Sequence, residues 1–113
     1  DPTEWDVYAM ANVQAPTGDP EYWFTVFATS DATRNQGKYS SEKLDELEKE
    51  LSAEFDIEKR AELAVQMQQT VLDDHAFVFC SFLKMSMISK ANVTGYESHA
   101  CDYYQVTADL DIN

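Results

Sequence analysis

The chain has 113 residues, of which 21 are acidic and 8 are basic, so its net charge at pH 7 is −13. This length suits one domain, and a hydrophobic fraction of 44% is enough for a core. The acidic balance argues against nucleic acid and anionic membrane surfaces as partners, because both require clustered Lys and Arg. No apolar run approaches the roughly 20 residues of a membrane span. The chain starts without an initiator Met or a signal-peptide pattern, which is typical of a mature chain or a piece cut from a longer one.

The first predicted element is a strand at residues 4–13, where apolar residues alternate (EWDVYAMANV). It ends in a loop of turn-forming residues that includes two prolines and a glycine. Asp19 is suited to cap a helix and Pro20 to occupy its first turn, so residues 21–29 are predicted to form a short helix. Residues 30–40 are polar and are predicted to form a surface loop.

Two further helices are predicted in the middle of the chain. Residues 41–54 carry an apolar stripe of Leu44, Leu47 and Leu51 on an otherwise charged helix. Asp56 is the predicted N-cap of a helix over residues 58–72. The residues of this last helix that we expect in the core are Ala61, Ala64, Val65, Val71 and Leu72.

The C-terminal third has the composition of strands. Residues 76–83 (AFVFCSFL) are almost continuously apolar, which predicts a strand buried on both faces. Residues 85–89 continue as extended chain, residues 90–95 form a turn, and residues 103–107 form a last strand. The order of elements therefore predicts an α/β or α+β fold, in which helices cover a sheet.

Four residues are candidate metal ligands: His75, Cys80, His99 and Cys101. The sequence contains no CxxC or HxxxH pair, and Cys80 lies in an apolar run that favours a buried free thiol. A disulfide between Cys80 and Cys101 is the alternative. We predict no metal and no cofactor.

No catalytic constellation is evident. The sequence has no GxSxG motif, and three glycines cannot form a phosphate-binding loop. Asp73 and Asp74 are neighbours at a predicted helix end, where their side chains diverge, so we interpret them as solvated surface. We therefore predict that the chain is not an enzyme. The aromatic run Tyr22-Trp23-Phe24 beside the proline-rich loop is either a core-facing helix or a wall against a ligand.

Several short motifs occur in a characteristic order: 5–8 (WDVY), 18–20 (GDP), 35–45 (NQGKYSSEKLD), 55–63 (FDIEKRAEL), 72–76 (LDDHA) and 93–96 (VTGY). In their order and spacing, these motifs resemble the C-terminal part of the family 5 extracellular solute-binding proteins, which are the peptide and nickel receptors of ABC transporters. The pairs 15–16 (AP) and 19–20 (DP) and the segment 84–90 (KMSMISK) are most similar to the nickel/metallophore branch.

The resemblance implies that residues 1–113 form one C-terminal subdomain, a fragment of the second large lobe of a two-lobed receptor like the periplasmic binding proteins. Its fold would be α/β, a mixed sheet covered by helices. The implied function is to bind a peptide, nickel or a nickel-chelate or opine-like solute and to deliver it to a membrane permease. The implied location is extracellular or periplasmic, with membrane association through a preceding segment.

Ligand contacts are expected where loops leave the carboxyl ends of strands in such a fold. Proline and glycine expose backbone groups there, and the first turn of the following helix has free N–H groups. The predicted ligand-binding residues are Gln14, Ala15, Pro16, Thr17, Gly18, Tyr22 and Trp23.

Two alternatives belong to other classes of protein. One is a small metal-dependent enzyme that uses His75, His99 and Cys101. The other is an acidic protein-interaction domain, which would expose an apolar patch on the 41–54 helix. In addition, unpaired sheet edges allow pairing between copies. We therefore expect the isolated chain to dimerise, or to exchange an element, through residues 4–13 or 76–83.

Overall fold

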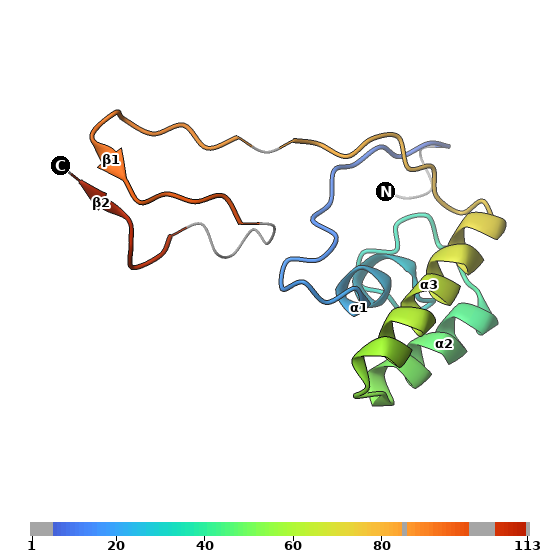
Figure 1. The fold of residues 1–113 in the computed structure, drawn as a ribbon. Coiled ribbons are helices and arrows are strands. Elements are labelled where there is room, and N and C mark those ends of the chain that lie inside the picture. Colours follow the sequence, from blue (N-terminus) through green and yellow to red (C-terminus); the bar gives the residue numbers. More distant parts are fainter. Residues whose placement is uncertain (1–5, 85, 100–105, 113) are drawn as a thin grey trace.

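A computed structural model describes residues 6–84, 86–99 and 106–112, and in this part of the chain it is a small helical unit with extended segments on either side (Figure 1). Its elements in chain order are α1 (Glu21–Trp23), the π-helix η1 (Phe24–Ala28), α2 (Glu42–Ala53), α3 (Ile57–Asp73), β1 (Val93–Thr94) and β2 (Asp111–Ile112).

The two long helices begin within one residue of the predicted starts, and Asp56 is the N-cap of α3 as predicted. The side chain of Ser41 accepts a hydrogen bond from the backbone N–H of Leu44 at the start of α2. Asp56 accepts from the N–H groups of Glu58 and Lys59 at the start of α3. These caps satisfy donors that the first helical turn leaves unpaired, so each helix start is determined locally.

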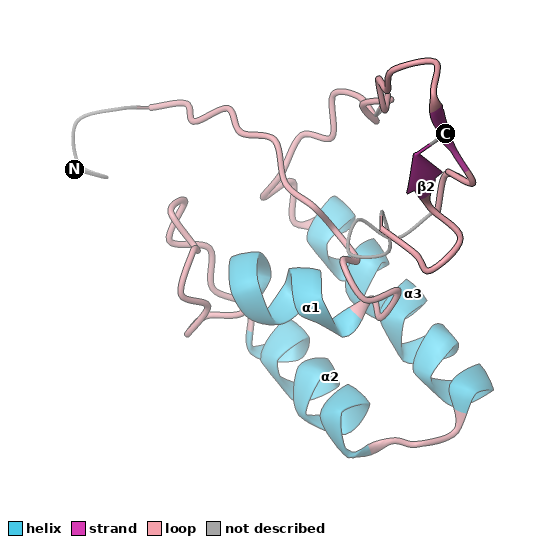
Figure 2. Cartoon of the chain, turned by 90° about the vertical axis from the view of Figure 1, so that its left-hand side faces the viewer, coloured by secondary structure: helices cyan, strands magenta, loops and turns pink. Residues whose placement is uncertain are grey.

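The core lies where α2 and α3 pack as an antiparallel pair against the short helix α1–η1 (Figure 2). The residues at its centre with 0% exposure include Leu44, Leu51 and Met67. The predicted stripe on α2 is therefore confirmed at Leu44 and Leu51, while Leu47 is half-buried against the same core.

The predicted core face of α3 was only partly correct. Ala64 and Val71 are buried as predicted, but Val65 is 63% exposed and Leu72 49% exposed, and Ala61 is exposed as well. The buried set of α3 is Leu63, Ala64, Met67, Thr70 and Val71. These positions follow the helical period of 3.6 residues, and Met67, which the prediction omitted, lies at the centre of the stripe.

The predicted mixed sheet covered by helices is wrong. Residues 6–13 and 76–84 are extended but belong to no strand, and the only described pairing is the short antiparallel one between β1 and β2. In residues 76–83, predicted to be buried on both faces, Val78 is 86% exposed and Phe82 84% exposed. A buried strand needs hydrogen-bonding neighbours and a layer over each face. Among the described residues this segment has no strand partner, and only Phe77 and Phe79 pack on the core, against Trp23.

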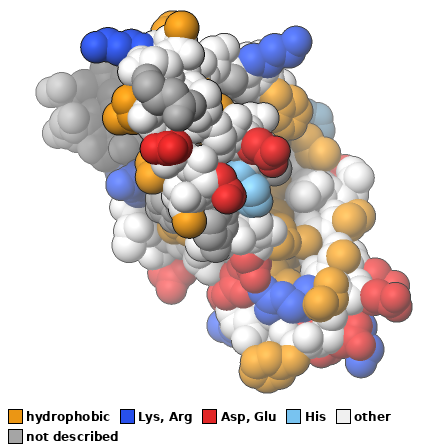
Figure 3. Space-filling view, turned by 60° about the vertical axis from the view of Figure 1, so that its left-hand side comes forward, with side chains coloured by type: hydrophobic (Ala, Val, Ile, Leu, Met, Phe, Trp, Pro, Cys, Tyr) orange, Lys and Arg blue, Asp and Glu red, His pale blue; other side chains and the backbone are white. Residues whose placement is uncertain are grey.

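The extended segments give the chain an open shape. The radius of gyration is 17.7 Å, whereas a compact domain of this length would have about 13 Å. The accessible surface is 8860 Å², against about 6,300 Å² for a compact monomer of the same mass. Hydrophobic side chains consequently reach the surface at several places, beside acidic ones (Figure 3).

The far end of the chain forms the two-residue pair of β1 and β2, with Val93 opposite Ile112. The predicted turn at 90–95 is confirmed, because the N–H of Val93 bonds to the carbonyl of Lys90 at 3.0 Å. Gly95 has a φ of 75°, and a Cβ there would collide with the backbone of Asp109. Of the predicted strand 103–107, residues 103–105 lie outside the described part, and 106–107 are in no strand.

Candidate functional site

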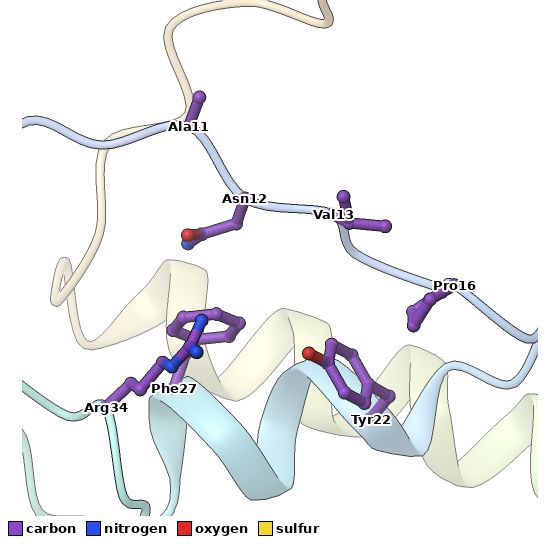
Figure 4. A pocket seen from close by; sticks show the side chains of 7 residues that line it. All are labelled: Ala11, Asn12, Val13, Pro16, Tyr22, Phe27 and Arg34. Carbon is purple, nitrogen blue, oxygen red and sulfur yellow. The ribbon is translucent and has the colours of Figure 1, made fainter. Parts of the chain in front are cut away.

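A pocket of about 240 Å³ lies between the helical segment α1–η1 and the extended chain that precedes it (Figure 4). Its lining residues come from three places in the chain, and they are Ala11, Asn12, Val13, Pro16, Tyr22, Phe27 and Arg34. Phe27 and Pro16 are buried, while Ala11, Val13 and Arg34 are exposed at its rim. Because its lining combines aromatic rings with polar groups, we take this pocket as the candidate functional site.

Two aromatic rings line the pocket, Tyr22 from α1 and Phe27 from the π-helical turn η1 that follows it. In η1 the N–H of Thr29 bonds to the carbonyl of Phe24 at 3.0 Å, which is a bond across five residues. Single π-helical turns occur frequently at functional sites.

Arg34 reaches the pocket because the loop after η1 folds back over the helix. Its backbone N–H donates to the carbonyl of Val26 at 2.9 Å. The amide of the next residue, Asn35, donates to the carbonyls of Thr29 at 3.1 Å and Tyr39 at 2.6 Å, and its oxygen accepts from the N–H of Tyr39 at 2.9 Å. These bonds fix the loop, so the position of Arg34 is determined by the backbone beside it.

The loop that forms the opposite side of the pocket is fixed by a turn and by Asp19. The N–H of Gly18 donates to the carbonyl of Ala15 at 3.0 Å, and the positive φ of Gly18, 86°, is one that glycine adopts without strain. Asp19 accepts from the N–H of Glu21 at 2.9 Å, the capping role that the sequence predicted. Pro20 follows in helical conformation, also as predicted.

Arg60 of α3 connects this loop to the core. Its Nη2 donates to Asp19 at 2.9 Å and to Glu21 at 2.8 Å, and its Nη1 donates to the carbonyls of Leu51 and Glu54 at 2.7 and 3.0 Å. The hydrogen bond to Glu21 is the largest of the effects that raise the pKa of Arg60. The guanidinium therefore joins the end of α2 to the start of α1, close to the pocket.

Arg34 is the one charged side chain among the seven that line the pocket. No ion pair is formed by Arg34 within the described part of the chain, whereas the ion pairs present there belong to Lys59 and Arg60. The chain has a net charge of −13, whereas the one charged side chain that lines the pocket is basic. The pocket's rings, its guanidinium and the amide of Asn12 can contact a small amphipathic molecule.

The seven predicted ligand-binding residues are not all brought together. Pro16 and Tyr22 line the pocket. The other residues of the loop, Gln14, Ala15, Thr17 and Gly18, lie beside it but not in its lining, and Ala15 serves the turn through its carbonyl. Trp23 is 9% exposed and lies in the core, where its ring meets Phe77 at 5.2 Å between centroids.

Sequence reasoning missed five of the lining residues: Ala11, Asn12, Val13, Phe27 and Arg34. The available signal was Arg34, a cation in a polar loop directly after an aromatic helix. The approach of residues 11–13 to that helix had no signal, because it depends on an extended chain packing against a distant surface.

The candidate metal ligands do not converge in the described residues. His75, Cys80 and His99 are exposed, and no group of three His, Cys, Asp or Glu suited to a metal occurs in the part of the chain that the structure describes. The prediction of a buried Cys80 is wrong, because the segment that carries it is uncovered. Cys101 and any disulfide with it lie outside the described residues.

Asp73 and Asp74 are exposed, as predicted, but Asp74 has a structural contact. It accepts a hydrogen bond of 2.6 Å from the hydroxyl of Tyr39. Burial, and then this bond to a carboxylate, raise the pKa of Tyr39. The apolar patch that an interaction domain would expose on α2 is absent, since Leu44 and Leu51 are buried.

Within the described residues, no helix has the length and apolar character needed to cross a membrane. No family model, curated protein or solved structure matches the chain.

Proposed function

We propose that this chain is part of the substrate-binding component of an ABC importer, with no catalytic activity of its own. The solute would be a peptide, nickel, or a nickel-chelate or opine-like small molecule. The receptor would lie outside the cytoplasm and deliver this solute to a membrane permease. In this proposal residues 1–113 form a C-terminal subdomain of the receptor and contribute one side of the ligand site.

The observation that carries the proposal is the position of the pocket. It adjoins the loop at residues 14–18, which the resemblance to solute-binding proteins indicated as the ligand loop, and two predicted contacts, Pro16 and Tyr22, line it. A volume of about 240 Å³ is below the roughly 300–1,000 Å³ of complete ligand sites. The pocket is therefore suited to one end of a solute whose remainder another part of the receptor covers.

The uncovered extended segments also support the proposal. Residues 76–84 and 86–89 have the composition of sheet strands, and Ile88 is 93% exposed in addition to Val78 and Phe82. Exposed apolar side chains of this kind are suited to contacts with another part of a receptor.

The proposal is tested on the protein expressed from its whole reading frame. Calorimetric titrations would use nickel chloride, a nickel–histidine chelate and a tripeptide as separate probes. We expect one of them to bind and Tyr22→Ala to weaken that binding about tenfold, equivalent to about 1.4 kcal/mol. Phe55→Ala is the matched control, because this ring is 90% exposed at the turn between α2 and α3 and outside the pocket.

A second measurement is co-purification with a permease encoded beside the gene. Binding of none of the three probes, together with no permease association, would contradict the proposal. Equal affinities for Tyr22→Ala and the parent protein would place the solute elsewhere.

A further inference from the structure

We infer that the pocket beside η1 is an anion-selective subsite. In it Arg34 binds the carboxylate of a small amphipathic solute, and the aromatic lining residues, Tyr22 and Phe27, contact its apolar part. The inference rests on the proposed function in so far as this pocket is the solute site, and it specifies the chemical class of the solute. The ligand end would carry one carboxylate next to an apolar or aromatic group.

The two arginines of the chain are in different states. Arg60 is saturated by two carboxylates and two carbonyls. Arg34 has no such partners in the described residues, and its guanidinium lines a pocket that contains no acid. Because a guanidinium presents paired N–H donors in a plane, its preferred partner is a carboxylate or phosphate bound through two oxygens.

Figure 4 shows the polar groups of Asn12 and Arg34 at one end of the pocket, with the hydroxyl of Tyr22 pointing toward them. The side chains of Asn12 and Arg34 are directed to the end that lies over Phe27, and Val13 and Pro16 lie toward the other end with Tyr22. A carboxylate at the polar end could accept from Arg34 and from the Asn12 amide. The rest of the molecule would then contact the ring of Tyr22 and the aliphatic surface of Pro16.

The geometry also disfavours other solute classes at this subsite. A cation would meet Arg34 with no acid among the lining residues to offset the repulsion. A neutral molecule could use the apolar wall but would leave the guanidinium without a charged partner. The affinity of the subsite should therefore be highest for an anion, lower for a neutral molecule and lowest for a cation.

The test uses three probes of nearly equal shape: phenylacetate, 2-phenylacetamide and phenethylammonium. Binding to the 113-residue chain is followed through the backbone amide signals of the lining residues in NMR titrations. Each probe has about ten non-hydrogen atoms. Phenylacetate should bind most tightly of the three, with a Kd of about 1–10 mM. The neutral amide should bind about five- to tenfold more weakly than the carboxylate, and the ammonium more weakly still.

Arg34→Gln should remove the preference, lowering the affinity for phenylacetate about five- to tenfold and leaving that for phenylacetamide within twofold. Arg34→Lys should retain part of it, since the charge remains but the paired donors are lost. Lys43→Gln is the matched control: it removes the same charge from the exposed surface of α2, outside the pocket. The backbone bond from residue 34 to Val26 does not involve the side chain, so these variants should fold.

Equal affinities of the carboxylate and the amide would overturn the inference, and so would a preference that survives Arg34→Gln or is lost equally in Lys43→Gln.

These outcomes can be told apart from failure of the receptor proposal. If the preference is present but the intact protein binds none of the three solute probes and associates with no permease, the anion subsite stands and the receptor proposal falls. If the intact protein binds a solute and a permease while Arg34→Gln changes nothing, only the subsite falls.

Discussion

The helical unit and the extended segments that flank it differ in where their stabilising contacts come from. In the helical unit, α2 and α3 are adjacent in sequence, are capped by Ser41 and Asp56, and bury each other's apolar faces. In the flanking segments, residues of equal hydrophobicity remain in solvent, with Val7 85% and Phe82 84% exposed. Two neighbouring helices can form a core from local sequence, whereas a strand needs a partner for its backbone as well as for its side chains.

The two regions are joined by aromatic and polar contacts rather than by secondary structure. Phe77 and Phe79 pack on Trp23, with ring centroids 5.2 and 5.7 Å away. On the other side, Arg60 holds Asp19 at the end of the preceding loop. Because the pocket lies along this junction, its geometry depends on both regions. The following predictions separate the contributions of the helical unit, the flanking segments and the junction.

The largest effect is expected in the core of the helical unit. Met67 is 0% exposed, so Met67→Ala leaves a cavity and should lower the free energy of unfolding by about 2–5 kcal/mol. Phe82→Ala removes a larger side chain from a flanking segment, but this side chain is already in solvent, and the change should be within about 0.5 kcal/mol. Urea denaturation followed by circular dichroism measures both. A comparable loss in both variants would show that the flanking segment is part of the folded core.

This contrast also explains how much of the structure the sequence could predict. The three helices and the caps at Asp19 and Asp56 were predictable because capping residues and apolar periodicity act within one or two turns. The sheet was not, since the apolar run 76–83 indicates only that a strand could be buried, and its burial depends on partners that the run does not specify. Of the seven residues that line the pocket only Pro16 and Tyr22 were predicted: Tyr22 follows from a local helix, whereas the position of Val13 depends on long-range packing.

The second effect concerns association. Uncovered strand-like segments should pair between copies, so the 113-residue chain should dimerise at high concentration through residues 6–13 or 76–83. The double substitution Val78→Lys with Phe82→Lys introduces charges on two exposed side chains and should weaken dimerisation at least tenfold, about 1.4 kcal/mol. The helix content should not change. Sedimentation equilibrium checks this, and a chain that stays monomeric at high concentration would refute the expectation.

The third effect concerns the junction beside the pocket. Asp19→Ala removes an acceptor for the first turn of α1 and should lower the free energy of unfolding by about 1 kcal/mol. Asp19→Asn retains an acceptor for Glu21 but loses the ion pair with Arg60, so the loss should be smaller. Urea denaturation gives the two values. If both variants lose the same amount, the ion pair rather than the cap carries the effect.

The smallest effect is a pH dependence where the chain leaves α3. Tyr39 donates a 2.6 Å hydrogen bond to Asp74, and its pKa is raised by burial and by this carboxylate. A folded-state pKa above the unfolded value means that the contribution to stability is present below about pH 10 and is lost as the pH rises through the folded-state pKa. Tyr39→Phe should therefore be less stable than the parent at pH 7, by no more than about 1 kcal/mol for an exposed bond, and the difference should shrink above pH 10. Urea titrations at pH 7 and at pH 10.5 measure it. Asp74→Asn should show a smaller loss with a weaker pH dependence, because its amide oxygen still accepts the bond, without the carboxylate charge that repels a phenolate. A difference between Tyr39→Phe and the parent that grows with pH would mean that the ionised phenol is the stabilised form and would contradict the assigned direction.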